Sequence, residues 1–264
     1  MQANDNTKGI LFIMTGMAFF SVQDSLIKFI FEDIALFELY LGRTLIQSTI
    51  LISFFLITKK KFTLKTHYPF LTLLRVICFF FGFGFFYISL TFMSLAMVSA
   101  IFFSGPFFLS MFAKFFLKEK IGIRRWSAIV VGFIGVIIVL NPNIEEFNFF
   151  KLAPVGCALC YACSMTITKY TSDKDNIYTQ MTLLYIFAII ASIIIFLISG
   201  DGKFNNFSDP TMQFIFREWF TNPSDSYHYV LVMGIVASIS FFCVFSAYSI
   251  ASPSIISLFE YSYI

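Results

Sequence analysis

Four charged residues lie in or beside long apolar runs and could bind a charged substrate. Asp24, Glu38 and Arg43 occur in the first two apolar runs of the chain, and Glu260 occurs in the last one. A charged side chain inside a membrane helix is costly unless it faces a partner or an aqueous cavity. Guanidinium groups suit bidentate binding of a carboxylate or phosphate. We therefore predict substrate-binding roles for Asp24, Arg43, Glu260 and Glu38.

Structural roles stay open for three of these residues. Asp24 and Lys28 are four residues apart, so they share one face of a helix and could pair with each other. Glu38 and Arg43 are five residues apart, which places them about 140° apart around a helix and makes them poor partners. Arg43 must therefore find another acceptor, which could be Asp24, a backbone carbonyl or an anionic group of a ligand.

Glu260 and the Gly105-Pro106 pair also carry two interpretations each. The Glu260 carboxylate could bind a cationic substrate or exchange a proton, but it would lie near the membrane surface if the chain ends at Ile264. Gly105-Pro106 loosens the fourth apolar run and frees backbone groups, as in the binding-site helices of transporters. Proline also occurs in ordinary membrane helices. We predict a helix break with a gating role at Gly105 and Pro106.

The composition indicates a membrane protein. Hydrophobic residues make up 58% of the chain and charged residues 12%, whereas soluble domains have about 45–50% and about 25%. Runs of about 20 apolar residues match the hydrocarbon thickness of a bilayer. We predict an all-α polytopic membrane protein with a ninth run beginning near Pro253. The eight complete runs are 9–31, 34–57, 68–94, 96–117, 126–141, 152–170, 177–199 and 228–250.

Positive charges outside the runs are strongly one-sided. Twelve lysines and arginines fall on the side of the N-terminus, and three fall on the other side. Since cytoplasmic loops carry the excess of Lys and Arg, this count predicts a cytoplasmic N-terminus. The twelve are Lys8, Lys59, Lys60, Lys61, Lys65, Lys114, Lys118, Lys120, Arg124, Arg125, Lys169 and Lys174.

The second half of the chain repeats features of the first. The first run ends with Phe20 eight residues before Lys28, and the sixth run ends with Tyr161 eight residues before Lys169. Each lysine is followed by an aromatic residue. Five runs separate the two starts, and this odd number predicts a second repeat of inverted topology. We assign the first repeat to residues 8–142 and the second to residues 150–264.

The spacing of the repeats also predicts an incomplete second half. Ser89 pairs with Ser246, an offset of 157 residues. Adding this offset to Leu140 predicts an end near position 297, about 33 residues beyond Ile264. The alternative is an eight- or nine-helix protein whose last segment is peripheral.

The stretch Phe116–Pro142 resembles the end of a repeat in the EamA family of the drug/metabolite transporter superfamily. It has Glu119 after the fourth run, basic residues before the fifth, and a G-x-x-G pattern at Gly132 and Gly135. Other segments resemble the first, second and ninth helices of that family, namely Asp24–Lys28, Phe37–Arg43 and Glu260-Tyr261.

This resemblance implies ten helices in two inverted five-helix halves that move amino acids, nucleosides and related metabolites. The segments around Asp24 and Arg43 most resemble members that take up S-adenosylmethionine. We therefore expect a secondary transporter of the bacterial inner membrane that works by alternating access on an amino acid or a derivative such as S-adenosylmethionine. The expected partners are a small-molecule metabolite and the lipid bilayer, without nucleic acid. A homodimer is compatible with the sequence, and we expect no cofactor and no metal.

Three alternatives stay open at this point. The chain could export amino acids or drug-like molecules, or it could be a non-functional fragment or one half of a split transporter. A polytopic membrane enzyme is the alternative from another class. It is disfavoured because the two histidines, His67 and His228, lie at run ends and no nucleophile–base constellation is present in the sequence.

Overall fold

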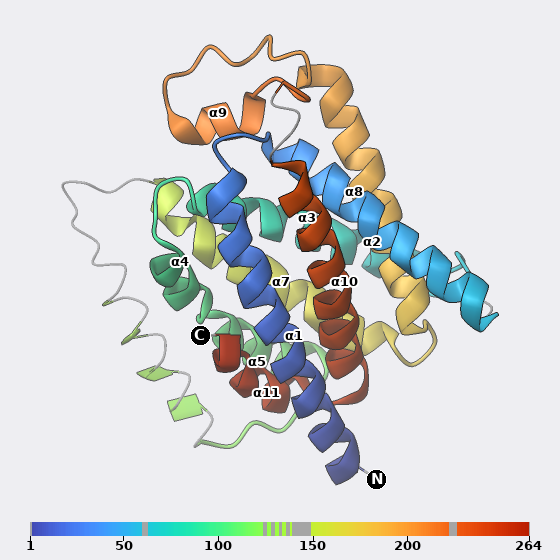
Figure 1. Ribbon diagram of the computed structural model, residues 1–264. Coiled ribbons are helices and arrows are strands. Elements are labelled where there is room, and N and C mark those ends of the chain that lie inside the picture. Colours follow the sequence, from blue (N-terminus) through green and yellow to red (C-terminus); the bar gives the residue numbers. More distant parts are fainter. Residues whose placement is uncertain are drawn as a thin grey trace.

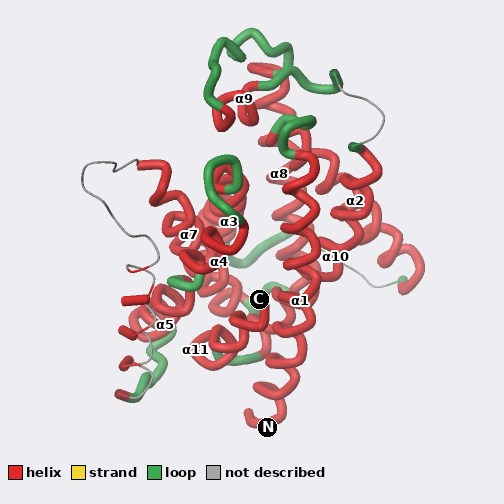
Figure 2. Tube along the Cα trace, turned by 60° about the vertical axis from the view of Figure 1, so that its left-hand side comes forward, coloured by secondary structure: helices red, strands yellow, loops and turns green. Residues whose placement is uncertain are grey.

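The described part of the chain is a bundle of helices. The computed structural model describes residues 2–59, 63–123, 149–221 and 226–263, with scattered positions between 126 and 138. Long apolar segments form helices because a helix satisfies its own backbone hydrogen bonds where lipid offers no partner. The N-terminus lies at one end of the bundle and α9 at the opposite end (Figures 1 and 2). The helices are α1 Gln2–Ile30, α2 Leu36–Thr58, α3 Pro69–Ser89, α4 Leu95–Phe102, α5 Gly105–Phe116, α7 Ala153–Thr171, α8 Ile177–Ser199, α9 Pro210–Phe216, α10 Tyr227–Ile250 and α11 Pro253–Ile256, with 3-10 turns at Phe149–Leu152 and Ser257–Tyr263.

Most predicted runs agree with the observed helices. Among the described residues, six helical segments are long and apolar enough to cross a membrane. The predicted run 177–199 coincides with α8, and the runs 34–57 and 228–250 match α2 and α10 to within two residues. The run 152–170 forms α7, which is not among these six segments. The predicted run 126–141 lies largely outside the described residues.

The fourth predicted run is divided into two helices. α4 ends at Phe102 and α5 begins at Gly105. Between them the backbone makes a hydrogen bond three residues back instead of four, from the Ser104 N–H to the Ile101 carbonyl at 3.0 Å. Pro106 lies in the first turn of α5, where its missing N–H removes no helical bond. The break expected from Gly105 and Pro106 is therefore present, one turn before the proline.

Helices from different halves of the chain pack against each other. α1 packs mainly on α10, α3 on α7, and α2 on both α8 and α10. Gly9 and Gly16 allow the close approach of α1, since a methyl group on Gly9 would lie 2.4 Å from the Ala251 side chain. Small residues at such crossings are a common feature of membrane helix contacts, because packing and not water exclusion joins the helices.

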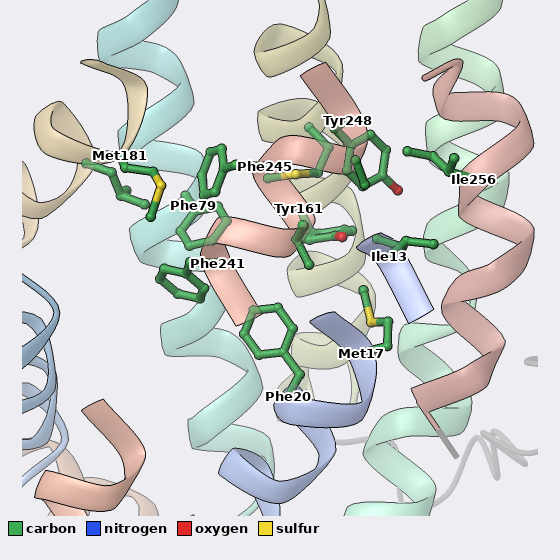
Figure 3. Close-up of a cluster of buried hydrophobic side chains, with 14 of the residues drawn as sticks. Ile13, Met17, Phe20, Phe79, Tyr161, Met181, Phe241, Phe245, Tyr248 and Ile256 are labelled. Atoms are coloured by element: carbon green, nitrogen blue, oxygen red, sulfur yellow. The ribbon is translucent and has the colours of Figure 1, made fainter. Parts of the chain in front are cut away.

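The core is aromatic, and apolar side chains also cover the outside. Phe79, Phe241 and Phe245 pack between α3 and α10, with Tyr161 and Tyr248 beside them (Figure 3). On the outer faces of α2 and α8, Leu56 and Leu197 are 74% and 73% exposed. A soluble protein rarely leaves such a surface uncovered, so these faces fit contact with lipid.

Two loops are tied together at the end of the bundle where α1 begins. We call it the lysine-rich end, because it carries Lys8, Lys118, Lys120, Lys169 and Lys174. Asp175, which follows α7, accepts hydrogen bonds from the Thr66 hydroxyl and from the backbone N–H of His67, 3.0 Å away. Burial by itself raises the pKa of the Asp175 carboxyl, but these hydrogen bonds outweigh it and hold that pKa below its usual value. Asp175 thus joins the segment before α3 to the segment after α7.

The first prediction concerns the close contact of α1. Gly9→Ala should lower the thermal unfolding midpoint, because the new methyl group meets the rigid Ala251 methyl, an overpacking cost of about 1–3 kcal/mol. Gly84→Ala is the matched control, since a methyl there meets nothing within 4 Å. Both substitutions gain similar helix propensity, about 1 kcal/mol. Equal midpoints for the two variants in detergent would contradict the packing described.

The second prediction concerns pH. Because the folded-state pKa of Asp175 is lowered, its contribution to stability is complete above the unfolded pKa of about 3.9 and is lost as the pH falls through the folded pKa. Asp175→Asn should therefore lower the unfolding midpoint at pH 6. In the parent chain the midpoint should fall between pH 5 and pH 3, about one unit either side of the unfolded pKa, and in Asp175→Asn this fall should be smaller. Asp173→Asn, at an exposed position nearby, should leave the decline in place, and identical curves for the two variants would refute the role of Asp175.

Candidate functional site

A small cavity lies in the centre of the bundle. Its volume is about 40 Å³, enough for a few water molecules. Asp24 is the charged residue among the side chains that line it. The wall comes from four helices, with Met17, Phe20 and Asp24 of α1, Phe79, Gly82, Phe83 and Phe86 of α3, Phe102 of α4, and Cys157 and Tyr161 of α7.

Asp24 belongs to a chain of polar side chains that reaches Arg43. The Gln23 amide donates to an Asp24 carboxylate oxygen at 3.0 Å and to the Tyr87 hydroxyl at 3.1 Å. Arg43 donates to the same hydroxyl. Tyr87 therefore links the first helix to the second, and the acceptor that Arg43 requires is this tyrosine.

Arg43 lies one layer behind the cavity wall. It is 2% exposed, and four aromatic rings surround its guanidinium at 5.1–5.6 Å. Cation–π contacts of this kind stabilise a desolvated guanidinium. Phe83 is one of the rings and also lines the cavity. A shift of Phe83 would thus bring Arg43 and the cavity into contact.

Glu260 adjoins the cavity from the other side. One of its carboxylate oxygens accepts hydrogen bonds from Tyr161 at 2.6 Å and from Tyr248 at 2.5 Å, and Tyr161 itself lines the cavity. The second carboxylate oxygen has no hydrogen-bond partner among the described residues. Glu260 is 1% exposed, so its carboxylate is buried inside the protein. Figure 3 shows Tyr161 and Tyr248 side by side within the core.

Glu38 lies away from the cavity. It lies in the first turn of α2. Its carboxylate accepts hydrogen bonds from the Tyr227 hydroxyl and from the backbone N–H of Phe220, the latter at 3.2 Å. Arg217 of the same loop donates to the carbonyls of Phe31 and Ile34. Glu38 therefore fastens the segment around α9 to the turn between α1 and α2, at the end of the bundle opposite the lysine-rich end.

The helix break borders the cavity. Phe102, the last residue of α4, is part of the cavity wall. A methyl group on Gly105 would meet nothing within 4 Å, so packing does not require a glycine there. The structure thus brings Asp24 and the break before Gly105 to one cavity. It places Glu260 behind Tyr161 and Arg43 behind Phe83, and it separates Glu38 from the cavity.

Sequence reasoning missed the tyrosines that organise this site. Tyr87 and Tyr161 are buried hydroxyls inside apolar helices, where a hydroxyl needs a hydrogen-bond partner. That placement is the signal that could have found them. It is weak, because tyrosines also gather at the membrane surface. Among the described residues, no group of three or more His, Cys, Asp or Glu side chains could hold a metal ion.

The chain is similar to known transporters. Residues 7–141 match the EamA-like transporter family. The S-adenosylmethionine uptake transporter of Rickettsia conorii is 27% identical over 253 residues, which cover 96% of this chain and 79% of that protein. The one from Rickettsia felis is 31% identical over 186 residues, 70% of this chain and 62% of that protein. The riboflavin transporter of Vibrio cholerae is 26% identical over 163 residues, 62% and 49% of the two chains.

The third prediction tests the link made by Tyr87. Tyr87→Phe removes the hydroxyl that accepts from Gln23 and Arg43, and hydrogen bonds to a charged group contribute about 1.5–3 kcal/mol. The unfolding midpoint should fall clearly. Tyr170→Phe, on an exposed ring that makes an edge-to-face contact with Tyr68, should change it little. A Tyr87→Phe midpoint equal to that of the control would show that Arg43 does not depend on this hydroxyl.

Proposed function

Since the chain belongs to the EamA-like transporter family, we propose that it carries a positively charged metabolite, S-adenosylmethionine or a related amino-acid derivative, across the bacterial inner membrane. The family and the relatives make it a multi-pass membrane transporter of small metabolites and not an enzyme. The observation that carries the finer proposal is the Asp24 carboxylate in the wall of the central cavity.

The charge of the cavity favours a cation. Asp24 lines the cavity, and Glu260 is hydrogen-bonded to Tyr161 of the cavity wall. The other carboxylate oxygen of Glu260 has no hydrogen-bond partner among the described residues. A cationic group of a substrate would offset the cost of two buried carboxylates, as opposite charges do inside membranes. S-adenosylmethionine carries a sulfonium and an ammonium group, whereas riboflavin is uncharged at neutral pH. The substrates named for the two kinds of relatives therefore differ in positive charge, which is the property that favours binding beside Asp24.

The size of the cavity requires a second conformation. Sites for drug-sized ligands have volumes of about 300–1,000 Å³, far above the 40 Å³ of the central cavity. The described conformation is thus closed around the centre, and a substrate of nucleoside size enters only when the wall moves. We assign the hinge to Gly105 and Pro106, because the break before them ends at Phe102 of the wall. Phe83 is the second movable element, and its displacement would expose Arg43 to the carboxylate of the substrate.

Alternating access between inverted halves, residues 8–142 and 150–264, completes the proposal. Support comes from reciprocal packing, since the first helix of each half, α1 or α7, packs on the third long helix of the other, α10 or α3. The break between α4 and α5 also has a counterpart in the short α11 and the 3-10 turn after it. The excess of lysines at the end where α1 begins supports a cytoplasmic N-terminus.

The fourth prediction is the test of this function. The chain is reconstituted in liposomes, and uptake of labelled S-adenosylmethionine is measured against an amino-acid panel and riboflavin. Asp24→Asn should reduce S-adenosylmethionine uptake about tenfold or more, because the cation loses its carboxylate partner. Asp201→Asn is the control, since that carboxylate is exposed.

Competition sharpens the same experiment. S-adenosylhomocysteine lacks the methyl group and the sulfonium charge, so it should compete poorly with S-adenosylmethionine for uptake by the parent chain. In Asp24→Asn, the difference in apparent affinity between the two compounds should be smaller. Uptake by Asp24→Asn at the parental rate would reject a cation site at Asp24. Uptake of riboflavin alone would assign the chain to the other substrate class, and export without import would reverse the direction proposed.

A further inference from the structure

A second, larger cavity opens at the lysine-rich end of the bundle. Its volume is about 440 Å³, within the range of about 300–1,000 Å³ that small-molecule sites occupy. Unlike the central cavity, it is bordered by charges of both signs. Its polar lining comes from the start of α1, the segment after α5, the end of α7 and the α10–α11 turn, with Asp5, Asn6, Glu119, Lys120, Lys169 and Ser252.

Lys169 enters this cavity with unused hydrogen-bonding capacity. Its ammonium donates to the Ser249 carbonyl at 3.2 Å, and an ammonium has three donors. Lys28, which corresponds to Lys169 in the repeat, donates to the carbonyls of Leu90 and Met93 at 2.6 and 3.0 Å. Lys169 thus holds the end of α10, and Lys28 holds the end of α3 in the same way. Lys28 makes two hydrogen bonds, and both are shorter than the one made by Lys169. Lys169 has the weaker attachment and lines a cavity.

Glu119 is fixed at the rim of the same cavity. The chain reverses at Lys118, whose φ of +56° is left-handed, and the Glu119 N–H returns to the Ala113 carbonyl at 3.1 Å. One oxygen of the Glu119 carboxylate accepts from the Ser252 hydroxyl at 2.8 Å. The backbone therefore holds this carboxylate in place, and the α10–α11 turn orients it.

Lys169 and Glu119 do not pair with each other. Their charges interact electrostatically, yet neither takes part in an ion pair within the part of the chain that the structure describes. Two opposite charges that face one cavity without contact leave room for a ligand that carries both signs. An α-amino-acid group has a carboxylate and an ammonium on the same carbon, so its two charges are complementary to Lys169 and Glu119.

We propose that this cavity is a second binding site, specific for the amino-acid end of a zwitterionic metabolite. The ligand carboxylate binds Lys169 and the ligand ammonium binds Glu119, with Ser252 orienting the glutamate. The site rests on the proposed function in one respect, because it would receive the transported metabolite at the lysine-rich mouth of its path. The ligand carboxylate uses donors of the Lys169 ammonium that the Ser249 carbonyl leaves free, so the attachment of α7 to the end of α10 is kept.

The test is a binding measurement on the full chain in detergent, with S-adenosylmethionine, methionine and decarboxylated S-adenosylmethionine as probes. Lys169→Met should weaken binding of the first two about tenfold or more, since they lose a charge-assisted bond, and leave the decarboxylated compound unaffected. Lys169→Arg keeps the charge and should stay within about threefold of the parent chain. Lys174→Met is the control, because Lys174 lies over the Tyr68 ring outside the cavity.

A local readout keeps the test independent of transport and of variant folding. In the parent chain, saturating methionine should slow the acetylation of Lys169 by an amine-directed reagent, measured by mass spectrometry, and should leave Lys174 unchanged. The same protection should persist in Asp24→Asn, which removes the central carboxylate. Parental affinity of Lys169→Met for S-adenosylmethionine, or equal acetylation with and without methionine, would overturn the second site. If Asp24→Asn loses uptake while methionine fails to slow the acetylation of Lys169, the second site is refuted and the proposed function stands.

Discussion

The cost of an unsatisfied charge where water is absent controls this structure. Arg43, Arg75 and Glu260 are each almost fully buried, and each is held by neutral oxygen atoms or hydroxyl groups of another helix. Arg43 donates to Tyr87, Arg75 donates to the Gln180 carbonyl at 2.7 Å, and Glu260 accepts from two tyrosines. An unpaired charge in the same place costs several kilocalories per mole, so these contacts fix which helices must be neighbours.

One of these contacts connects the two halves of the chain, and the others join helical segments within one half. Glu260 binds tyrosines of α7 and α10, and Arg75 joins α3 to α8. Partners that are neutral hold a charge without neutralising it, as the proposed binding of a substrate ion requires. A transporter must release its substrate as well as bind it, and carboxylates supported by hydroxyls meet this need better than carboxylates locked in ion pairs.

Local pattern was a good guide to the helices and a poor guide to their interruptions. The run 177–199 was predicted to the residue as α8, because nothing but apolar length decides it. The run 96–117 was predicted to break at Gly105 and Pro106, but the chain breaks just before them, at Phe103 and Ser104. The sequence did not show that Phe102, where α4 ends, packs its ring against Tyr161 of α7. Of the four predicted site residues, only Asp24 lines the cavity itself.

The sequence by itself determined that the chain is a helical membrane protein, that charged residues occur inside its apolar runs, and which family it resembles. These follow from composition, run length and short motifs, all of which are local. The tertiary structure alone decided what those charges meet. Tyr87 lies 44 residues from Arg43, and Tyr161 lies 99 residues from Glu260. Lys169 and Glu119 share a cavity only because the ends of α5, α7 and α10 converge there. Periodicity along a helix shows which face is polar, but the partner of that face comes from a helix that only the packing of the whole bundle selects.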